Sequence, residues 1–486
     1  MMHYDTLIHG GTVVTATNST KSDIAISNGR IAAIGHALGT ATNMIDATDL
    51  LALPGGVDSH CHIEQLSASG LINSDTFETA TTAAAAGGTT TVIPFAAQYE
   101  GMSLHKVVDD YHELATKGAI VDYAFHMILA GPSQAVLDHE LPKLVRSGHS
   151  SIKMFMTYDR LRVDDLQMLD VLTKARELEA FVMVHAENHS MITWMVKKLL
   201  SAGATAPKFH SVSHPRAGEA EAFTRLIAMS ELTDQPVMIF HVSSAEGAAV
   251  IARAQARGVK VFAETCTQYL TLTAEVMEKP GMEGAKWVCS PPMRMQSDQD
   301  ALWSALRSGV LQTVTSDHAP YSFDKKGKFT AGNAPNFKQI PNGMPGVQWR
   351  LPVLFDQMVT KRKMTVNDFV RLTSTASAEI YGLAPRKGLI APGSDADIVL
   401  WNPEKTVQLS DEMVHDGAGY NPYCGRNITG WPQTVIRRGK IIAEDGQVSA
   451  QPGSGKFLAR AAGESAKPSG HRQPEFNPRL NFSADI

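Results

Sequence analysis

The sequence has few cysteines, no long hydrophobic run and no large excess of charge. Its four cysteines are scattered over 486 residues without a CxxC pair, which excludes a disulfide-stapled scaffold. No apolar stretch reaches the roughly 18 residues that a transmembrane helix needs, so we expect no membrane association. The first residues lack the basic and apolar regions of a signal peptide. These absences together favour a cytoplasmic protein.

The charges of the chain nearly balance. Lys and Arg number 44 and Asp and Glu number 49, so the net charge is −5 at pH 7. Because no run of basic residues offers a local patch either, we expect no nucleic-acid partner. The hydrophobic fraction of 43% and the charged fraction of 19% predict a folded chain with a large core.

Both ends of the chain show the alternating apolar and polar pattern of antiparallel strands. Near the N-terminus, Asn28-Gly29 separates two such runs and predicts a hairpin. We expect residues 1–53 and 386–464 to form one small β-sandwich domain together. Residues 465–486 are rich in Pro, Ser, Arg and Asn without apolar periodicity, which predicts an extended or disordered tail.

Residues 54–385 alternate short apolar strands with longer helical segments, as at 168–179 and 245–257. Continuous apolar strands are typical of a parallel sheet that is buried on both faces. Eight strand–helix units predict an α/β fold with a (β/α)8 TIM barrel as the catalytic domain, and a doubly wound open sheet is the alternative. The expected strands cover residues 51–60, 89–95, 121–130, 151–156, 181–186, 236–242, 260–265 and 312–317.

Ionisable side chains recur at the carboxyl ends of these strands, where barrel enzymes have their active sites. His60 and His62 close the first strand and face the same side, because strand side chains alternate. Two imidazoles on one face can share a metal ion, although a hydrogen-bonded pair at the barrel mouth is the alternative. Cys61 faces the other way and is expected to be a packed side chain.

Lys153 stands in the middle of the apolar strand 151–156. An ammonium group is costly to bury there, because desolvation disfavours the charge. Three interpretations remain open at this point. The lysine could reach an acidic partner at the rim, act as a nucleophilic amine, or be converted by CO2 into an anionic carbamate that bridges two cations.

His185, His241 and Asp317 also follow apolar runs, at the ends of three further strands. Each alone is more often structural, and Asp317 could be a turn residue ahead of Pro320. A barrel would bring them all to one mouth, where four imidazoles and a carboxylate match the ligand preference of Zn²⁺. Two cations there would need an anion between them. The expected ligands are His60, His62, Lys153, His185, His241 and Asp317.

With these residues placed, the chain resembles the amidohydrolase superfamily and, within it, the dihydropyrimidinase/hydantoinase family of cyclic amidases. The resemblance covers nearly the whole chain, from about residue 5 to about residue 453. Its most specific passages are SIKMFMTY at 151–158, IPNGMPG at 340–346 and KGLIAPGSDADIV at 387–399. The last is similar to the superfamily's return from barrel to β-sandwich.

The resemblance implies two Zn²⁺ per subunit and a homotetramer. His60, His62 and Asp317 would bind one zinc, and His185 and His241 the other. Lys153, carboxylated on N6 by CO2, would bridge them.

The resemblance also implies the reaction. The substrate would be a small cyclic amide, a 5,6-dihydropyrimidine or a 5-substituted hydantoin, opened to an N-carbamoyl amino acid by a metal-bridging hydroxide. Tyr158 would donate to the oxyanion, and Asp317 would act as base and then as acid. Backbone groups at Ser290 and Asn342 would hold the ring amide.

The segment after the paired histidines departs from the family pattern. Dihydroorotases have a carboxylate-binding arginine where this chain has Glu64, which we expect to repel a carboxylate substrate. Segment 63–73 has small and polar side chains instead of many Met and Phe residues, so it does not identify the substituent on the substrate ring. A cyclic imide hydrolase, an allantoinase and a non-catalytic assembly protein of the same fold are the alternatives. The presence of all six expected ligands argues against the assembly protein.

Overall fold

The computed structural model describes residues 3–67, 70–362, 364–471 and 473–484. Parallel strands follow one another in the order β10-β9-β11-β12-β13-β14-β15-β16, and β8 pairs with β9. The circle closes where His62 N donates to His318 O at 2.6 Å. The predicted (β/α)8 barrel is therefore confirmed. Its strands are β8 (Gly56–Cys61), β9 (Thr89–Gln98), β10 (Asp122–Tyr123), β11 (His126–Leu129), β12 (Ser151–Phe155), β13 (Phe181–His185), β14 (Val237–Ile239), β15 (Val261–Cys266) and β16 (Thr313–Thr315).

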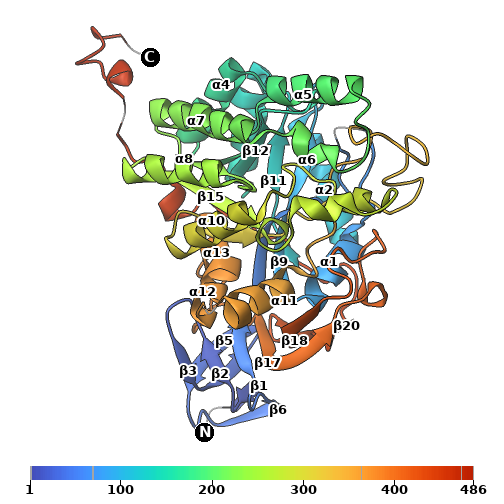
Figure 1. Ribbon diagram of the computed structural model, residues 1–486. Coiled ribbons are helices and arrows are strands. Elements are labelled where there is room, and N and C mark those ends of the chain that lie inside the picture. The colour runs from blue at the N-terminus through green and yellow to red at the C-terminus, as the bar shows by residue number, and fades with distance from the viewer. Residues whose placement is uncertain (1–2, 68–69, 363, 472, 485–486) are drawn as a thin grey trace.

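Helices surround the barrel (Figure 1). Two of them, α4 and α8, confirm the helical spacing read at 168–179 and 245–257, and side chains of Asp164 and Ser244 cap their first turns. The helices are α1 (Phe77–Ala86), α2 (Leu104–Gly118), α3 (Leu141–Arg146), α4 (Asp165–Glu177), α5 (His189–Ser201), α6 (Phe209–Ser213), α7 (Arg216–Thr233), α8 (Ala245–Ala256), α9 (Thr267–Thr271), α10 (Gln296–Arg307), α11 (Arg350–Phe355), α12 (Val366–Val370) and α13 (Ala376–Ile380). Short 3-10 segments cover Ala274–Glu278, Glu283–Trp287, Asp411–Met413, Glu464–Ala466 and Pro474–Phe476, and π-helical turns cover Val136–Glu140, Asp356–Lys361 and Arg371–Thr375.

Two further sheets lie at one end of the barrel (Figure 1). One has the order β5-β4-β1-β6 and comes from the N-terminal part alone, and the other has the order β20-β19-β18-β17-β7-β2-β3 and joins both chain ends. Their apolar faces share a core that includes Ile24 and Ile398, so the predicted β-sandwich is confirmed. The hairpin at Asn28-Gly29 joins β4 and β5 as predicted. The strands are β1 (His3–His9), β2 (Thr12–Val14), β3 (Ser19–Lys21), β4 (Asp23–Ser27), β5 (Arg30–Gly35), β6 (Thr40–Asp46), β7 (Leu51–Pro54), β17 (Ile398–Gln408), β18 (Asn427–Arg437), β19 (Lys440–Glu444) and β20 (Gln447–Val448).

Two expected strands are wrong in detail. Residues 51–60 are not one strand, because β7 pairs with β17 in the sandwich and β8 starts the barrel. The break falls at Gly55, where a Cβ atom would lie 2.1 Å from Thr90 Oγ1, so the backbone passes too close for any side chain. Residues 121–130 form two short strands, β10 and β11, that both pair with β9.

The C-terminal segment passes along the outside of the barrel, and the end of the chain then projects away from it (Figure 1). Ser469 N and Gly470 N donate to the carboxylate of Asp234 at 3.0 and 2.8 Å, and Lys260 Nζ donates to Lys467 O at 2.9 Å. Residues 472, 485 and 486 of the predicted tail lie outside the described residues. None of the described helices has the length and apolarity to cross a bilayer.

Candidate active site

A cavity of about 410 Å³ lies at the carboxyl ends of the barrel strands, a volume typical of small-molecule sites. It is lined by every side chain that the sequence analysis named for the site, although these residues are spread over the chain from position 60 to position 342. The nine residues are His60, His62, Lys153, Tyr158, His185, His241, Ser290, Asp317 and Asn342.

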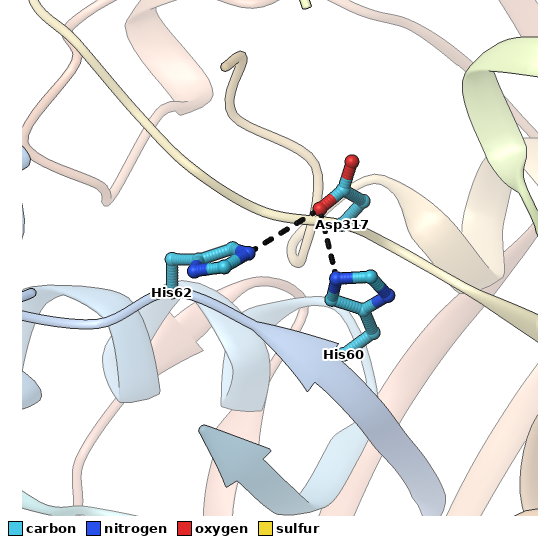
Figure 2. Close-up of side chains that lie close together, drawn as sticks. All are labelled: His60, His62 and Asp317. Atoms are coloured by element: carbon cyan, nitrogen blue, oxygen red, sulfur yellow. Dashed lines mark ion pairs between the residues drawn. The ribbon is translucent and has the colours of Figure 1, made fainter. Parts of the chain in front are cut away.

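His60, His62 and Asp317 form the first cluster (Figure 2). Asp317 Oδ1 lies 3.1 Å from His60 Nε2 and 3.5 Å from His62 Nε2, and one ligand atom from each residue lies within 4.8 Å of the others. Burial raises the pKa of Asp317, but His60 and His62 outweigh it and hold the pKa well below its usual value. The cluster therefore offers an ionised carboxylate and two imidazoles, a ligand set that suits a divalent cation.

His185 and His241 form the second cluster, with ring centroids 4.4 Å apart. Burial lowers the pKa of both imidazoles, so they are in the neutral form that binds metals. Glu187 Oε2 lies 2.8 Å from His185 Nε2. A proton held on Nε2 by this carboxylate leaves the lone pair of Nδ1 available to a cation.

Lys153 lines the same cavity as the two clusters and is completely buried. Its Nζ faces three aromatic rings, with centroids at 3.8 Å (Phe240), 4.9 Å (Phe155) and 5.6 Å (Phe95). Burial lowers the pKa of Lys153 to about 7, so a reactive neutral amine is accessible. The expectation of an acidic partner at the rim finds no support, since no hydrogen-bond partner of Nζ exists in the described chain.

The donor set of these residues suits divalent cations. Within the part of the chain that the structure describes, Lys153 Nζ and His241 Nδ1 are buried without a hydrogen-bond partner. Orphaned polar atoms of this kind are rare in folded proteins, because burial without a partner costs free energy. The rings adjoin, with the His60 centroid 5.5 Å from that of His62 and 5.4 Å from that of His241.

The backbone is strained at three of the site residues. Tyr158, His241 and Asp317 have φ angles of 71°, 42° and 47°, a left-handed conformation that non-glycine residues adopt at a free-energy cost of about 1–3 kcal/mol each. Strand β14 ends at Ile239 and β16 at Thr315. The expected strands 236–242 and 312–317 included His241 and Asp317, but both residues lie just beyond the observed strands. The turn directs their side chains into the cavity.

Tyr158 lines the cavity beside His185. Its ring centroid lies 5.1 Å from that of His185, and burial raises its pKa, so the phenol keeps the proton that it can donate. Asn342 Nδ2 donates to Ser290 Oγ at 3.0 Å beside it. This placement favours a hydrogen-bond donor to substrate over an aromatic ring that only packs at the rim.

The segment after the histidines contributes polar side chains to the cavity. Glu64 does not line the cavity, because its Oε2 accepts a hydrogen bond from Phe77 N at 3.1 Å at the start of α1. Glu64 therefore has a structural partner outside the cavity, and the expected repulsion of a substrate carboxylate stays a prediction. Gln65, Ser67 and Asn73 supply the polar lining from this segment, and residues 68 and 69 of it lie outside the described residues.

The sequence analysis missed the carboxylates behind the histidines. Glu264 is hydrogen-bonded to His60 Nδ1 from β15, and Glu187 contacts both His185 and His214. A carboxylate at the centre of the apolar run VFAETC is the signal that could have revealed Glu264, because a buried charge in a strand requires a partner.

Replacing Glu264 by Gln should weaken the site without unfolding the barrel. The amide keeps the shape but loses the charge that orients His60, and loss of such a partner lowers metal affinity or activity by about 10–100-fold. Metal titration followed by fluorescence or calorimetry measures the change, with Glu444→Gln on the exposed edge of β19 as the matched control. Unchanged metal affinity in Glu264→Gln would contradict the role of Glu264.

Comparison with known proteins agrees with this geometry. A model of the amidohydrolase family matches residues 51–442. The D-hydantoinase of Ralstonia pickettii is 42% identical over 457 residues, which cover 94% of this chain and 99% of that protein. The crystal structure of dihydropyrimidinase from Brevibacillus agri NCHU1002 superposes with a TM-score of 0.91 at 40% identity, covering 94% and 99% of the two chains. The L-hydantoinase (dihydropyrimidinase) from Arthrobacter aurescens has a TM-score of 0.84 at 25% identity, with 94% and 100% covered.

Proposed function

Since this chain belongs to the amidohydrolase family, we propose that it opens hydantoin and 5,6-dihydropyrimidine rings to N-carbamoyl amino acids. It is a metal-dependent hydrolase that acts on the C–N bonds of cyclic amides, like the hydantoinases that it matches over nearly its whole length. The observation that supports the proposal most is that all nine residues named for this chemistry line the same cavity.

The proposal includes two Zn²⁺ per subunit. His60, His62 and Asp317 would hold one, His185 and His241 the other, and Lys153, carboxylated by CO2, would lie between them. Bound there, the cations would polarise the ring carbonyl and lower the pKa of a water molecule. The buried, unpartnered amine of Lys153 supports the carboxylation, because the carbamate replaces a costly buried ammonium with a group that cations stabilise.

Each of the remaining side chains has its own role in the reaction. The Tyr158 phenol donates to the oxygen of the scissile carbonyl as negative charge develops there. The carboxylate of Asp317 accepts a proton from the attacking water and returns it to the ring nitrogen as the C–N bond breaks. Backbone groups at Ser290 and Asn342 hold the adjoining amide of the ring.

The proposal also includes that the protein is a homotetramer and that it is located in the cytoplasm. The tetramer is supported by the family resemblance alone. The reducing compartment is supported by the four cysteines, all of them among the described residues, which form no disulfide.

A substrate panel with chiral analysis of the products tests the proposed reaction. The enzyme loaded with two metals should open dihydrouracil and 5-substituted hydantoins, and the higher identity to D-hydantoinases supports N-carbamoyl-D-amino acids as products. Turnover of succinimide alone would indicate a cyclic imide hydrolase, and turnover of allantoin alone an allantoinase. Inactivity on all four ring types with both metals bound would refute the proposal.

A further inference from the structure

Lys328 is a second completely buried lysine, in the loop that follows the Asp317 turn. Its Nζ donates to three backbone oxygens, those of Val288 at 3.1 Å, Pro341 at 2.7 Å and Gly343 at 2.6 Å. An ammonium group has three N–H donors and no acceptor, so the three oxygens can accept from all of its donors. Burial lowers the pKa of Lys328 to about 7, and the three oxygens favour the protonated form.

The three oxygens belong to the two segments that carry Ser290 and Asn342. These segments touch each other directly, since Gly343 N donates to Val288 O at 3.0 Å and Asn342 Nδ2 to Ser290 Oγ at 3.0 Å. Lys328 lies behind this contact and does not line the cavity. It therefore joins both segments from the side away from substrate.

Other hydrogen bonds also hold these two segments. Tyr269 Oη donates to Pro291 O at 2.7 Å, and Ala319 N donates to Met344 O at 3.0 Å. His210 Nε2 lies 2.8 Å from Cys289 O, and Gly343, at φ 139°, packs so closely that a Cβ atom would lie 2.3 Å from Ala319 O. Removing the ammonium would take a charge-assisted hydrogen bond from each of the three carbonyls. Val288 O would keep only the bond from Gly343 N, and the oxygens of Pro341 and Gly343 would lose the donor that Lys328 supplies. Lys328 therefore adds three hydrogen bonds to those that fix the relative position of Ser290 and Asn342.

We propose that Lys328 is a positioning residue that holds the backbone at Ser290 and Asn342 where it can bind the substrate ring. Lys328 thereby sets the preference for rings with a second amide beside the scissile bond. This inference rests on the proposed function, which assigns ring binding to those two residues. A simple lactam has only the scissile amide, so its binding does not depend on the backbone position that Lys328 maintains at Ser290 and Asn342.

Lys328→Met tests this role, because methionine keeps the unbranched side chain as far as Cε and removes all three donors. We expect KM for dihydrouracil to rise about tenfold, the loss that follows when buried polar partners are left unpaired, with kcat little changed. The Ki of δ-valerolactam as a competitive inhibitor should change less than twofold. Lys326→Met, an exposed lysine in the same loop, is the matched control and should leave both constants unchanged.

The ratio of the two constants separates positioning from a general structural role. Equal rises in KM and Ki, or a fall in kcat alone, would overturn the proposal. If Lys328→Met does not fold, Lys328→Gln, which keeps two donors on a shorter arm, must show the same selective rise, and wild-type selectivity in that variant would overturn it. Wild-type enzyme with both metals that opens no ring contradicts the proposed function instead.

Discussion

Asp317→Asn is expected to lower kcat for ring opening by about 10³-fold or more, within the range lost when a general acid–base group is removed. Asn has nearly the same shape as Asp but cannot accept the proton from water or return it to the ring nitrogen. It also removes the negative charge that His60 and His62 contact at 3.1 and 3.5 Å. The initial rate on dihydrouracil with saturating metal measures the loss.

Three measurements separate chemistry from folding for this variant. The unfolding temperature should stay near the wild-type value, because the fold does not depend on one side chain at the barrel mouth. The metal content per chain reports whether the first cluster still binds its cation. Asp170→Asn, on the exposed face of α4, should leave turnover unchanged. Wild-type turnover in Asp317→Asn would exclude the proton-transfer role.

Lys153→Met should abolish turnover for a different reason, the loss of the proposed bridging anion. We expect the metal content to fall from two per chain to less than one and kcat/KM to fall by at least about 10³-fold, because metal assistance is worth several kcal/mol. Methionine fits the surrounding rings of Phe95, Phe155 and Phe240 without a charge to desolvate. The metal-free variant should therefore unfold at a temperature no lower than that of metal-free wild-type protein.

Native mass spectrometry reads the modification itself. The wild-type chain should be heavier than its sequence by one CO2 at neutral pH, and Lys153→Met should lose this increment. Lys143→Met, at an exposed lysine on α3, should retain both the increment and the two metals. A wild-type chain with two metals and a bare amine at Lys153 would require another bridge and would contradict this part of the proposal.

Much of the site could be read from local patterns. The apolar runs at 181–185 and 236–240 predict buried parallel strands, and the polar residues that interrupt or follow such runs mark the barrel mouth. The resemblance then assigned roles to residues such as Tyr158, Ser290 and Asn342, whose residue types alone indicate little. All of them line the cavity, because parallel strands of one barrel end on the same side.

Contacts between distant segments escaped the local patterns. Glu264 meets His60 only because closure of the barrel leaves β16 alone between β15 and β8. Glu64 turns to the start of α1 instead of the cavity. The break between β7 and β8 was missed for a similar reason. Both strands are apolar, and their separation into different sheets depends on which neighbours they pair with.

The sequence by itself determined the strand–helix alternation, the family and the common direction of His60 and His62, because these follow from short-range periodicity and from motifs within one segment. Only the tertiary structure decided that Lys153 faces aromatic rings and that Lys328 joins the segments of Ser290 and Asn342. Burial and hydrogen-bond partners arise when the barrel closes and brings distant residues together, and no local pattern encodes them.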